Sequence, residues 1–449
     1  MAFMGIKMGW YSSVAQFAAE QIGGREPEPP RQHRSALFDP RFDDDRSPEP
    51  EHRSFETVHP MLAVPSRLET SAVDRVYMAF DVSQPVAQPD DLRGRDLEVT
   101  ALLSGVLHRR NHGIVSGPRG SGKTSLVRVF GQYADREGVV VLYSACDDGT
   151  SFGELIRSYL EQIPSAMVDP DSIELFEQRV LSFGAESSPY QATGVLAMLK
   201  YSQLVVVLDE FDRITDRDMH DKISSLLKLV SDARLAVRFV LVGGNSAFAD
   251  IVRAHPSLMR HITRVSTAPL ASEAVAELLG RCADRCGVTF SDSSMRLIEE
   301  IACGSPYHAR LFGMHGALNA LAGQSQVIDL EHVESGLEEA FGEWSMLNPV
   351  DAQAFREILG GSYGSPQEIV AFARQVAHHN ADDDFARHWK TKRREHAHAE
   401  PAAFAELGQT VHMIDGHATF RDATAPQFLL ALNHAHGVGA DQMKGGRRA

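Results

Sequence analysis

The sequence predicts an α/β fold in which a parallel sheet carries helices on both faces. An all-helical domain and a winged-helix domain follow it. β-Branched runs typical of buried parallel strands alternate with helix-period stretches up to about residue 243. A glycine-rich loop joins the first of these runs to a helix. From residue 272 to 341 the β-branched runs disappear and only helical periodicity remains.

The sheet is expected to contain four short apolar strands, at 112–115, 139–143, 204–208 and 238–242. A helix-period stretch from Leu97 to Leu107 precedes the glycine loop. Further helices are expected at 124–133, 152–162, 171–200 and 216–231. Strands that alternate with helices at this spacing imply a parallel sheet covered on both faces.

The carboxyl-terminal half is predicted to be largely helical, with helices at 272–286, 291–302, 306–322 and 330–341. After two or three more helical stretches, two alternating segments (409–414 and 417–420) flank Asp415-Gly416, a strong hairpin signal. A last helix is expected at 425–435. Helices followed by a hairpin and a helix fit a winged helix-turn-helix.

We therefore divide the chain into five parts. The first part mixes Pro, Arg and acidic residues at 23–53, a composition that cannot bury enough apolar surface to order itself. Residues 1–23 fit both a docking amphipathic helix and a frayed tail. The parts are an N-terminal extension that is largely a disordered linker (1–90), an α/β domain (91–271), a helical domain (272–343), a winged-helix domain (344–437) and a disordered tail (438–449).

The composition restricts the kinds of partner and the compartment that we expect for this chain. With 449 residues, 43% of them hydrophobic, the chain has an ordinary globular composition. Its net charge of −16 argues against coating nucleic acid or anionic membrane by bulk electrostatics. Four scattered cysteines suit a reducing cytosol, and for Cys282 and Cys286 buried thiols are favoured over a metal pair. The first 24 residues resemble no signal peptide and no apolar run is long enough to span a bilayer, so we expect a cytoplasmic protein.

The glycine loop satisfies G-x-x-x-x-G-K-[ST], the phosphate-cradling P-loop. Its residues are Gly117, Pro118, Arg119, Gly120, Ser121, Gly122, Lys123 and Thr124, followed by Ser125. The loop N–H groups would face a β-phosphate, Lys123 would reach the β- and γ-phosphates, and Thr124 would offer its hydroxyl to Mg²⁺. The strand before the loop and the helix after it are the context that the motif requires.

Polar side chains end two of the predicted strands. Asp209 and Glu210 follow an apolar strand about 85 residues after Lys123, room enough for an extra strand between the two. Asp209 would hold Mg²⁺ through water, and Glu210 would polarise the attacking water. On the next strand, Asn245, with Ser246 as the substitute, would sit between Mg²⁺ and that water. A surface Asp-Glu pair and a plain glycine turn are the alternatives.

Together with Arg93-Gly94-Arg95 and the run from Asp209 to Arg213, these residues resemble the AAA+ ATPases, which are P-loop NTPases. The likeness is greatest to the initiator (origin-recognition) type and to STAND signalling ATPases, and it covers residues 92–341. It implies that the helical domain is a lid. The turn Gly304-Ser305-Pro306 resembles the second-sensor motif, which implies that Arg310 contacts the γ-phosphate and that Pro306 lies near the adenine; a plain helix-capping turn is the alternative.

The resemblance also implies an arginine supplied by a neighbouring subunit. Arg260 is favoured over Arg264, although STAND proteins often lack this element. Residues 387–394 hold five cations and a Trp, and from Met346 onward 11 basic residues nearly balance 12 acidic ones. The carboxyl-terminal domain is therefore the part where a DNA-facing surface is plausible, with a solvated helix face as the alternative.

Three functions stay open. The first is a Mg²⁺-dependent ATPase, compatible with a homo-oligomer, that remodels or recruits DNA or a protein client. The second is a STAND-like nucleotide-gated signalling protein with little turnover. The third is a winged-helix DNA-binding protein, which the acidic total charge disfavours.

Overall fold

A computed structural model describes residues 71–200, 203–244, 248, 251, 253–361, 366–379, 410–414 and 417–445. Residues 1–70, with the helix expected at 1–23, lie outside this part, as do Asn245, Ser246 and the basic run 387–394. None of the described helices is long and apolar enough to cross a membrane.

The amino-terminal half of the described chain forms a five-stranded sheet in which every pair of neighbours is parallel. Its strands are β1 (His112–Ser116), β2 (Val140–Ala145), β3 (Leu204–Asp209), β4 (Val237–Gly243) and β5 (Ile262–Ser266). The order β2-β3-β4-β1-β5 places one strand, β4, between the strand before the glycine loop and the strand that ends at Asp209. The predicted fold class is confirmed. The edge strand β5 was not predicted, because only Thr263 and Val265 of its five residues are buried and no apolar run marks it.

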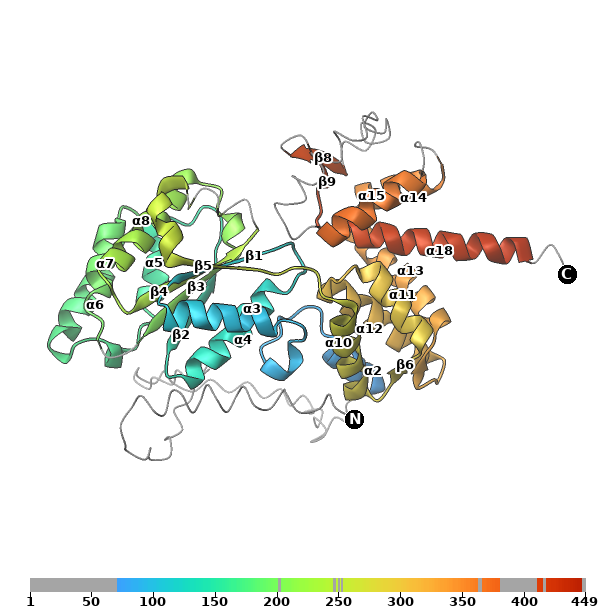
Figure 1. The fold of residues 1–449 in the computed structure, drawn as a ribbon, viewed down its shortest axis with the longest axis horizontal. Helices are drawn as coiled ribbons and strands as arrows, with labels where there is room; N and C mark the ends of the chain where they lie inside the picture. The colour runs from blue at the N-terminus through green and yellow to red at the C-terminus, as the bar shows by residue number, and fades with distance from the viewer. Residues whose placement is uncertain are drawn as a thin grey trace, which may run out of the picture. The chain divides into compact units, whose positions relative to one another are not determined.

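Helices cover both faces of the sheet (Figure 1). On one face, Val115, Val207 and Val240 pack against α3 (Asp96–Leu103) and α4 (Lys123–Arg136). On the other, Ile114, Leu208 and Leu241 share a core with four more helices. These are α5 (Phe152–Leu160), α6 (Ile173–Leu181), α7 (Pro189–Leu196) and α8 (Arg217–Asp232). The helix predicted at 171–200 is wrong as a single element, because a new helix with its own Ser188 capping box begins at Pro189.

The helical domain contains the four predicted helices, α10 (Ser272–Cys286), α11 (Asp292–Ala302), α12 (Pro306–Ala322) and α13 (Leu330–Leu347). Between them lie two short parallel strands, β6 (Thr289–Phe290) and β7 (Val327–Ile328). Three further helices, α14 (Pro349–Leu359), α15 (Pro366–His379) and α18 (Ala425–Gly445), share its apolar core. Trp344 stacks on both Phe355 and Phe428, so the predicted boundary at 343/344 crosses a continuous core.

The predicted hairpin is present: β8 (Val411–Ile414) pairs antiparallel with β9 (His417–Phe420), and Ile414 lies opposite His417. The winged-helix arrangement stays a prediction. Helix α18 runs past Gly437 to Gly445, beyond the predicted start of the tail at residue 438. A single glycine weakens a helix by only about 1 kcal/mol and need not end it.

A helix also lies within the N-terminal extension, outside its Pro-rich stretch at 23–53. α2 (Ala72–Ala79) begins with a capping box between Ser71 and Asp74. Val76 and Phe80 are fully buried in the core that includes α10 and α12. A few apolar side chains at helical spacing thus find a partner surface that the local sequence does not reveal.

Candidate nucleotide-binding site

The glycine loop connects the end of β1 to the first residue of α4. Gly120 and Gly122 have φ angles of +80° and +87°, the left-handed region that glycine tolerates. Gly122 is the N-cap of α4, and no side chain caps this helix. The first-turn N–H groups of α4 therefore have no intrahelical acceptor and are available to an anion.

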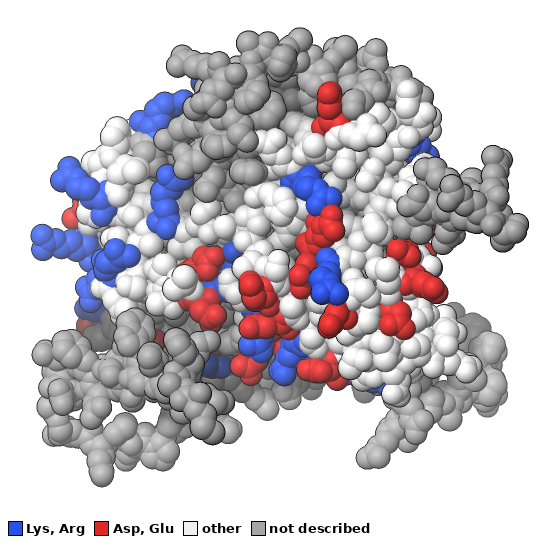
Figure 2. Space-filling model, turned by 45° about the vertical axis from the view of Figure 1, so that its right-hand side comes forward, with Lys and Arg blue, Asp and Glu red and all other residues white. Residues whose placement is uncertain are grey.

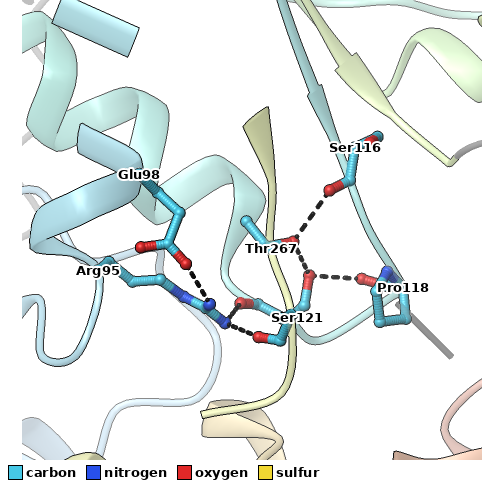
Figure 3. A network of polar contacts seen from close by, with 7 residues as sticks. Arg95, Glu98, Ser116, Pro118, Ser121 and Thr267 are labelled. Carbon is cyan, nitrogen blue, oxygen red and sulfur yellow. Dashed lines mark hydrogen bonds and ion pairs between the residues drawn. The ribbon is translucent and has the colours of Figure 1, made fainter. Parts of the chain in front are cut away.

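A buried network fixes the base of this loop (Figure 3). Ser121 Oγ donates to the Pro118 carbonyl over 2.8 Å and lies 2.6 Å from the Thr267 hydroxyl. Arg95, only 3% exposed, donates to the Ser121 carbonyl (3.1 Å) and the Ala268 carbonyl (2.5 Å). Burial lowers the pKa of Arg95, and its ion pair with Glu98 opposes this shift. Arg95 thus ties α3, the loop and the chain after β5 together, a role that the sequence did not reveal.

Lys123 lies across the loop. Its Nζ donates to the carbonyl oxygens of Gly117 and Pro118, each over 2.9 Å. Burial lowers the pKa of Lys123, while the carboxylates of Asp212 and Asp209 oppose the shift. The ammonium therefore stands between the loop and a cluster of carboxylates, the place expected for a group that bridges phosphates.

Thr124 and Asp209, the predicted metal-binding pair, lie together. Asp209 is 3% exposed, and its Oδ2 accepts hydrogen bonds from Thr124 Oγ1 (2.8 Å) and from the Tyr143 hydroxyl. Its Oδ1 accepts from the Glu210 N–H over 2.8 Å. Burial and Asp209 raise the pKa of Tyr143, so the phenol stays a donor. A hydroxyl and a carboxylate that meet in this way are the hard oxygen donors that Mg²⁺ prefers, so the residues present fit this ion.

Tyr143 was not predicted as part of the site. It comes from β2, whose run of β-branched residues drew attention only as a buried strand. The Arg128 guanidinium stacks over its ring at 3.6 Å. No local pattern links residues 128, 143 and 209, so only the folded sheet reveals this contact.

Glu210 adopts a left-handed backbone conformation (φ +52°), which is strained for a residue other than glycine. Its half-exposed carboxylate accepts a hydrogen bond from Arg213 Nη1 over 2.9 Å. Arg213 Nη2 also lies 3.5 Å from an oxygen of Asp147. The predicted catalytic carboxylate is therefore paired with an arginine of its own chain, which the sequence analysis placed in a motif but gave no role.

The carboxyl end of β4 lies between the loop and Asp209, as the sheet order requires. Gly243 packs so closely on Asp212 that a Cβ there would lie 2.5 Å from Oδ1. Asn245 and its substitute Ser246 follow directly but lie outside the described residues.

The lid residues predicted from the second-sensor motif divide into two groups. Pro306 and its neighbour Tyr307 lie close to the loop: a Cβ added to Gly122 would lie 3.6 Å from Pro306 Cγ, and one added to Gly120 would lie 3.2 Å from Tyr307 Cβ. Arg310 instead donates from Nη1 to the Asp81 carbonyl over 3.1 Å. Its buried Nε has no hydrogen-bond partner among the described residues.

The segment 80–92, which we call the strap, runs from α2 to the turn before α3. The Val86 N–H donates to Ser125 Oγ over 3.0 Å, so the strap contacts the residue directly after the P-loop motif. Asp91 forms ion pairs with Arg281 and Arg285 of α10. The strap therefore touches both the α/β domain and the lid.

Arg260 and Arg264 lie away from the loop of their own subunit. Arg260 lies in the last turn of the 3₁₀-helix Pro256–His261, which precedes β5, and Arg264 lies on β5 opposite Ile114 of β1. Both are exposed. Because β1 and β5 are parallel and the loop follows Ser116 at the carboxyl end of β1, Arg260 lies at the opposite end of the strand pair.

A glycine loop after β1, with a buried carboxylate two strands away, defines a nucleotide-binding domain of the P-loop class. Residues 91–242 match the family described as "AAA ATPase domain", so this part of the chain is similar to that family.

Solved structures that resemble the chain include a Walker-type ATPase of Pyrococcus abyssi, with 16% identity and a TM-score of 0.44, covering 79% of this chain and 100% of that one. Cdc6p of Pyrobaculum aerophilum has 16% identity and a TM-score of 0.42, covering 80% and 96%. The ORC2 protein of Aeropyrum pernix has 16% identity and a TM-score of 0.41, covering 81% and 98%. Such values say nothing of substrates or partners. No curated protein matches the chain.

Proposed function

We propose that the protein binds and hydrolyses ATP in a Mg²⁺-dependent reaction at the glycine loop. The observation that carries this proposal is the contact between Thr124 Oγ1 and the buried Asp209 carboxylate, beside an uncapped helix N-terminus and Lys123. The match of residues 91–242 to the AAA ATPase domain supports it.

The residues have distinct roles in this proposal. The N–H groups of 117–124 and Lys123 bind the β- and γ-phosphates, with Ser125 and Pro306 bordering the nucleotide. Thr124 and Asp209 hold Mg²⁺, which neutralises charge that develops on the phosphates. Glu210 accepts a proton from the attacking water, and Asn245, or Ser246 in its place, orients that water.

Two rearrangements must precede hydrolysis. Glu210 has to leave Arg213 before its carboxylate can reach a water at the γ-phosphate, and Asp147 is placed to keep Arg213 occupied when it does. Arg310 has to leave the Asp81 carbonyl to contact the nucleotide. Since Pro306 and Tyr307 already touch the loop, ATP would shift the lid and the strap together, a population shift driven by differential affinity.

The cycle would act on a partner. We infer a cytoplasmic ATPase of the initiator type that remodels or recruits DNA or a protein client, with Arg260 completing the site of a neighbouring copy and Arg264 as the second choice. The lid (272–343) and the carboxyl-terminal domain (344–437) would transmit the change, the latter as a winged helix. Size-exclusion chromatography with and without ATP tests the assembly.

Steady-state ATPase measurements on the full chain test the enzyme reading. We expect turnover for the wild type and a large loss for Glu210→Gln. Equal, near-zero rates for both would refute hydrolysis.

The pairing of Glu210 with Arg213 and of Arg310 with Asp81 favours a second candidate, a STAND-like nucleotide-gated signalling protein. Both contacts hold groups needed for hydrolysis away from a nucleotide. In that case ATP would bind and change the assembly state without appreciable turnover.

A further inference from the structure

The turns that precede β4, β1 and β5 carry arginines. Arg234 precedes β4, Arg109 and Arg110 precede β1, and Arg260 precedes β5; all four are exposed. The three strands are parallel neighbours, so these turns lie at one edge of the sheet, the edge opposite the glycine loop. Because adjacent strands lie about 5 Å apart, the turns begin within about 10 Å of one another. We call this set of four arginines the basic edge.

Carboxylates are scarce around the basic edge. The sequence has no Asp or Glu at 99–111, at 233–249 or at 251–271, although the whole chain has a net charge of −16. Asp232, which lies close in sequence to Arg234, is paired with Lys228 over 2.6 Å. Figure 2 shows one face of the molecule, on which basic side chains lie at the left and most of the acidic ones lie elsewhere.

The buried Arg238 of β4 adds to this excess of positive charge. Its guanidinium donates to the carbonyl oxygens of Leu235 and Val237. Burial lowers the pKa of Arg238, and the positive charge of Arg110 lowers it further. Arg238 is the second residue of β4, so its charge adds to that of the exposed arginines at this edge of the sheet.

Arg110 and Arg234 have φ angles of +56° and +54°. This left-handed conformation is common directly after a helix: the Leu235 N–H donates to the Val230 carbonyl, and the Asn111 N–H donates to the Gly105 carbonyl. Glycine would be less strained in both turns.

We propose that the basic edge binds the phosphate backbone of a nucleic acid, with Arg109, Arg110 and Arg234 making the contact where Arg260 serves a neighbouring copy. The cations of the edge are all arginines, whose planar fork pairs with phosphate oxygens through two hydrogen bonds. Among the described residues of these three turns, Met259 is the only exposed large apolar side chain, whereas a protein interface has an apolar core. The proposal deepens the DNA branch of the proposed function, and it does not require hydrolysis.

Binding of the full chain to a fluorescein-labelled DNA duplex of about 20 base pairs tests this, by anisotropy between about 50 and 200 mM salt. We expect Arg109→Gln/Arg110→Gln to weaken binding at least ~10-fold at low salt. The slope of log K against log salt should also fall by about 2, roughly 0.9 for each lost phosphate contact. The matched control Arg217→Gln/Arg296→Gln removes the same charge from exposed positions on α8 and α11 and should bind like the wild type.

A second variant excludes misfolding as the cause. Arg110→Gly fits the left-handed backbone, so it should raise the melting temperature while it weakens duplex binding. The proposal is overturned if the double variant binds like the wild type, if the control loses as much affinity, if no duplex binds at low salt, or if only neutralisation of Lys390 to Arg394 abolishes binding.

The ATPase assay separates this proposal from the function proposed above. Lys123→Ala should lose hydrolysis and keep duplex binding, and the Arg109/Arg110 variants should show the reverse. Wild-type hydrolysis by Lys123→Ala would refute the proposed function and leave the basic edge untouched. Loss of duplex binding in Lys123→Ala would count against an independent basic edge.

Discussion

At the carboxyl ends of β1 and β3 the sheet gathers a lysine and carboxylates, whereas at the amino ends of β4, β1 and β5 it exposes arginines. The carboxyl edge holds its key carboxylate, Asp209, 3% exposed and fixed by the hydroxyls of Thr124 and Tyr143. The basic edge leaves its cations in solvent. Chemistry on a phosphate needs charges held in place away from water, while recognition of a backbone needs accessible and adaptable ones. The same strands thus carry both kinds of site at opposite ends.

The largest expected effect is the loss of ATP turnover in Lys123→Ala, a residue of the carboxyl edge. Lys123→Ala removes the only side-chain cation of the glycine loop besides Arg119. We expect ATP turnover to fall at least ~100-fold, because charge stabilisation in the transition state is lost. Colorimetric phosphate release measures this, and a variant with unchanged turnover would contradict the role given to Lys123.

Glu210→Gln separates nucleotide binding from catalysis at the carboxyl edge of the sheet. We expect kcat to fall by ~10²–10⁴-fold with ATP affinity kept, since a general base acts only in the chemical step. Kinetics paired with binding of a fluorescent ATP analogue distinguishes this from loss of binding. Equal losses in affinity and turnover would show that Glu210 positions the nucleotide instead.

The pH dependence of folding stability tests the burial of His112, which lies at the same end of the sheet as the basic edge. Burial, with help from the nearby Arg238 charge, lowers the pKa of His112 at the start of β1 to about 3. Its neutral ring accepts from the Phe239 N–H, and Nε2 lies 3.0 Å from the Leu227 carbonyl. In the unfolded chain the His112 ring has a pKa of about 6.5, so below that pH it takes up a proton only when the protein unfolds. The free energy of unfolding therefore decreases as the pH falls below about 6.5.

The loss expected from His112 alone is roughly 2 kcal/mol between pH 6.5 and 5, at ~1.4 kcal/mol per pH unit. Urea unfolding of the wild type and of His112→Gln measures it. His308 in the lid, whose pKa burial also lowers to about 3, adds a second contribution of the same sign. The His112→Gln variant should therefore retain about half of the slope. An unchanged slope in that variant would contradict the assignment.

The smallest effect concerns Tyr143→Phe. Removing one donor to Asp209 Oδ2 should raise the Mg²⁺ concentration for half-maximal activity by about 2- to 10-fold, the usual worth of one hydrogen bond. ATP affinity without metal should change less than the Mg²⁺ requirement, because the phenol donates to the Asp209 carboxylate. The test is a Mg²⁺ titration of turnover, with Tyr133→Phe on α4 as the control; similar shifts in both variants would remove Tyr143 from the site.

Local pattern was enough for the apolar strands and for the meeting of Thr124 with Asp209. Continuous β-branched runs can be buried in only a few ways, and parallel strands bring their carboxyl ends to one edge. It was not enough for β5 and α2, where one-sided burial leaves a mixed sequence. The contacts of Glu210 with Arg213, of Asp209 with Tyr143 and of Arg310 with Asp81 depend on side-chain directions that no spacing encodes.

The helical domain begins before the sheet does. Its core includes Phe80, so the chain leaves this domain through the strap, forms the sheet and returns through residues 267–271. Arg95, just after the strap, donates to the Ala268 carbonyl and so joins the two connections between the domains. A truncation that starts at residue 91, where the AAA ATPase domain match begins, would remove the first of these connections along with part of the apolar core of the helical domain.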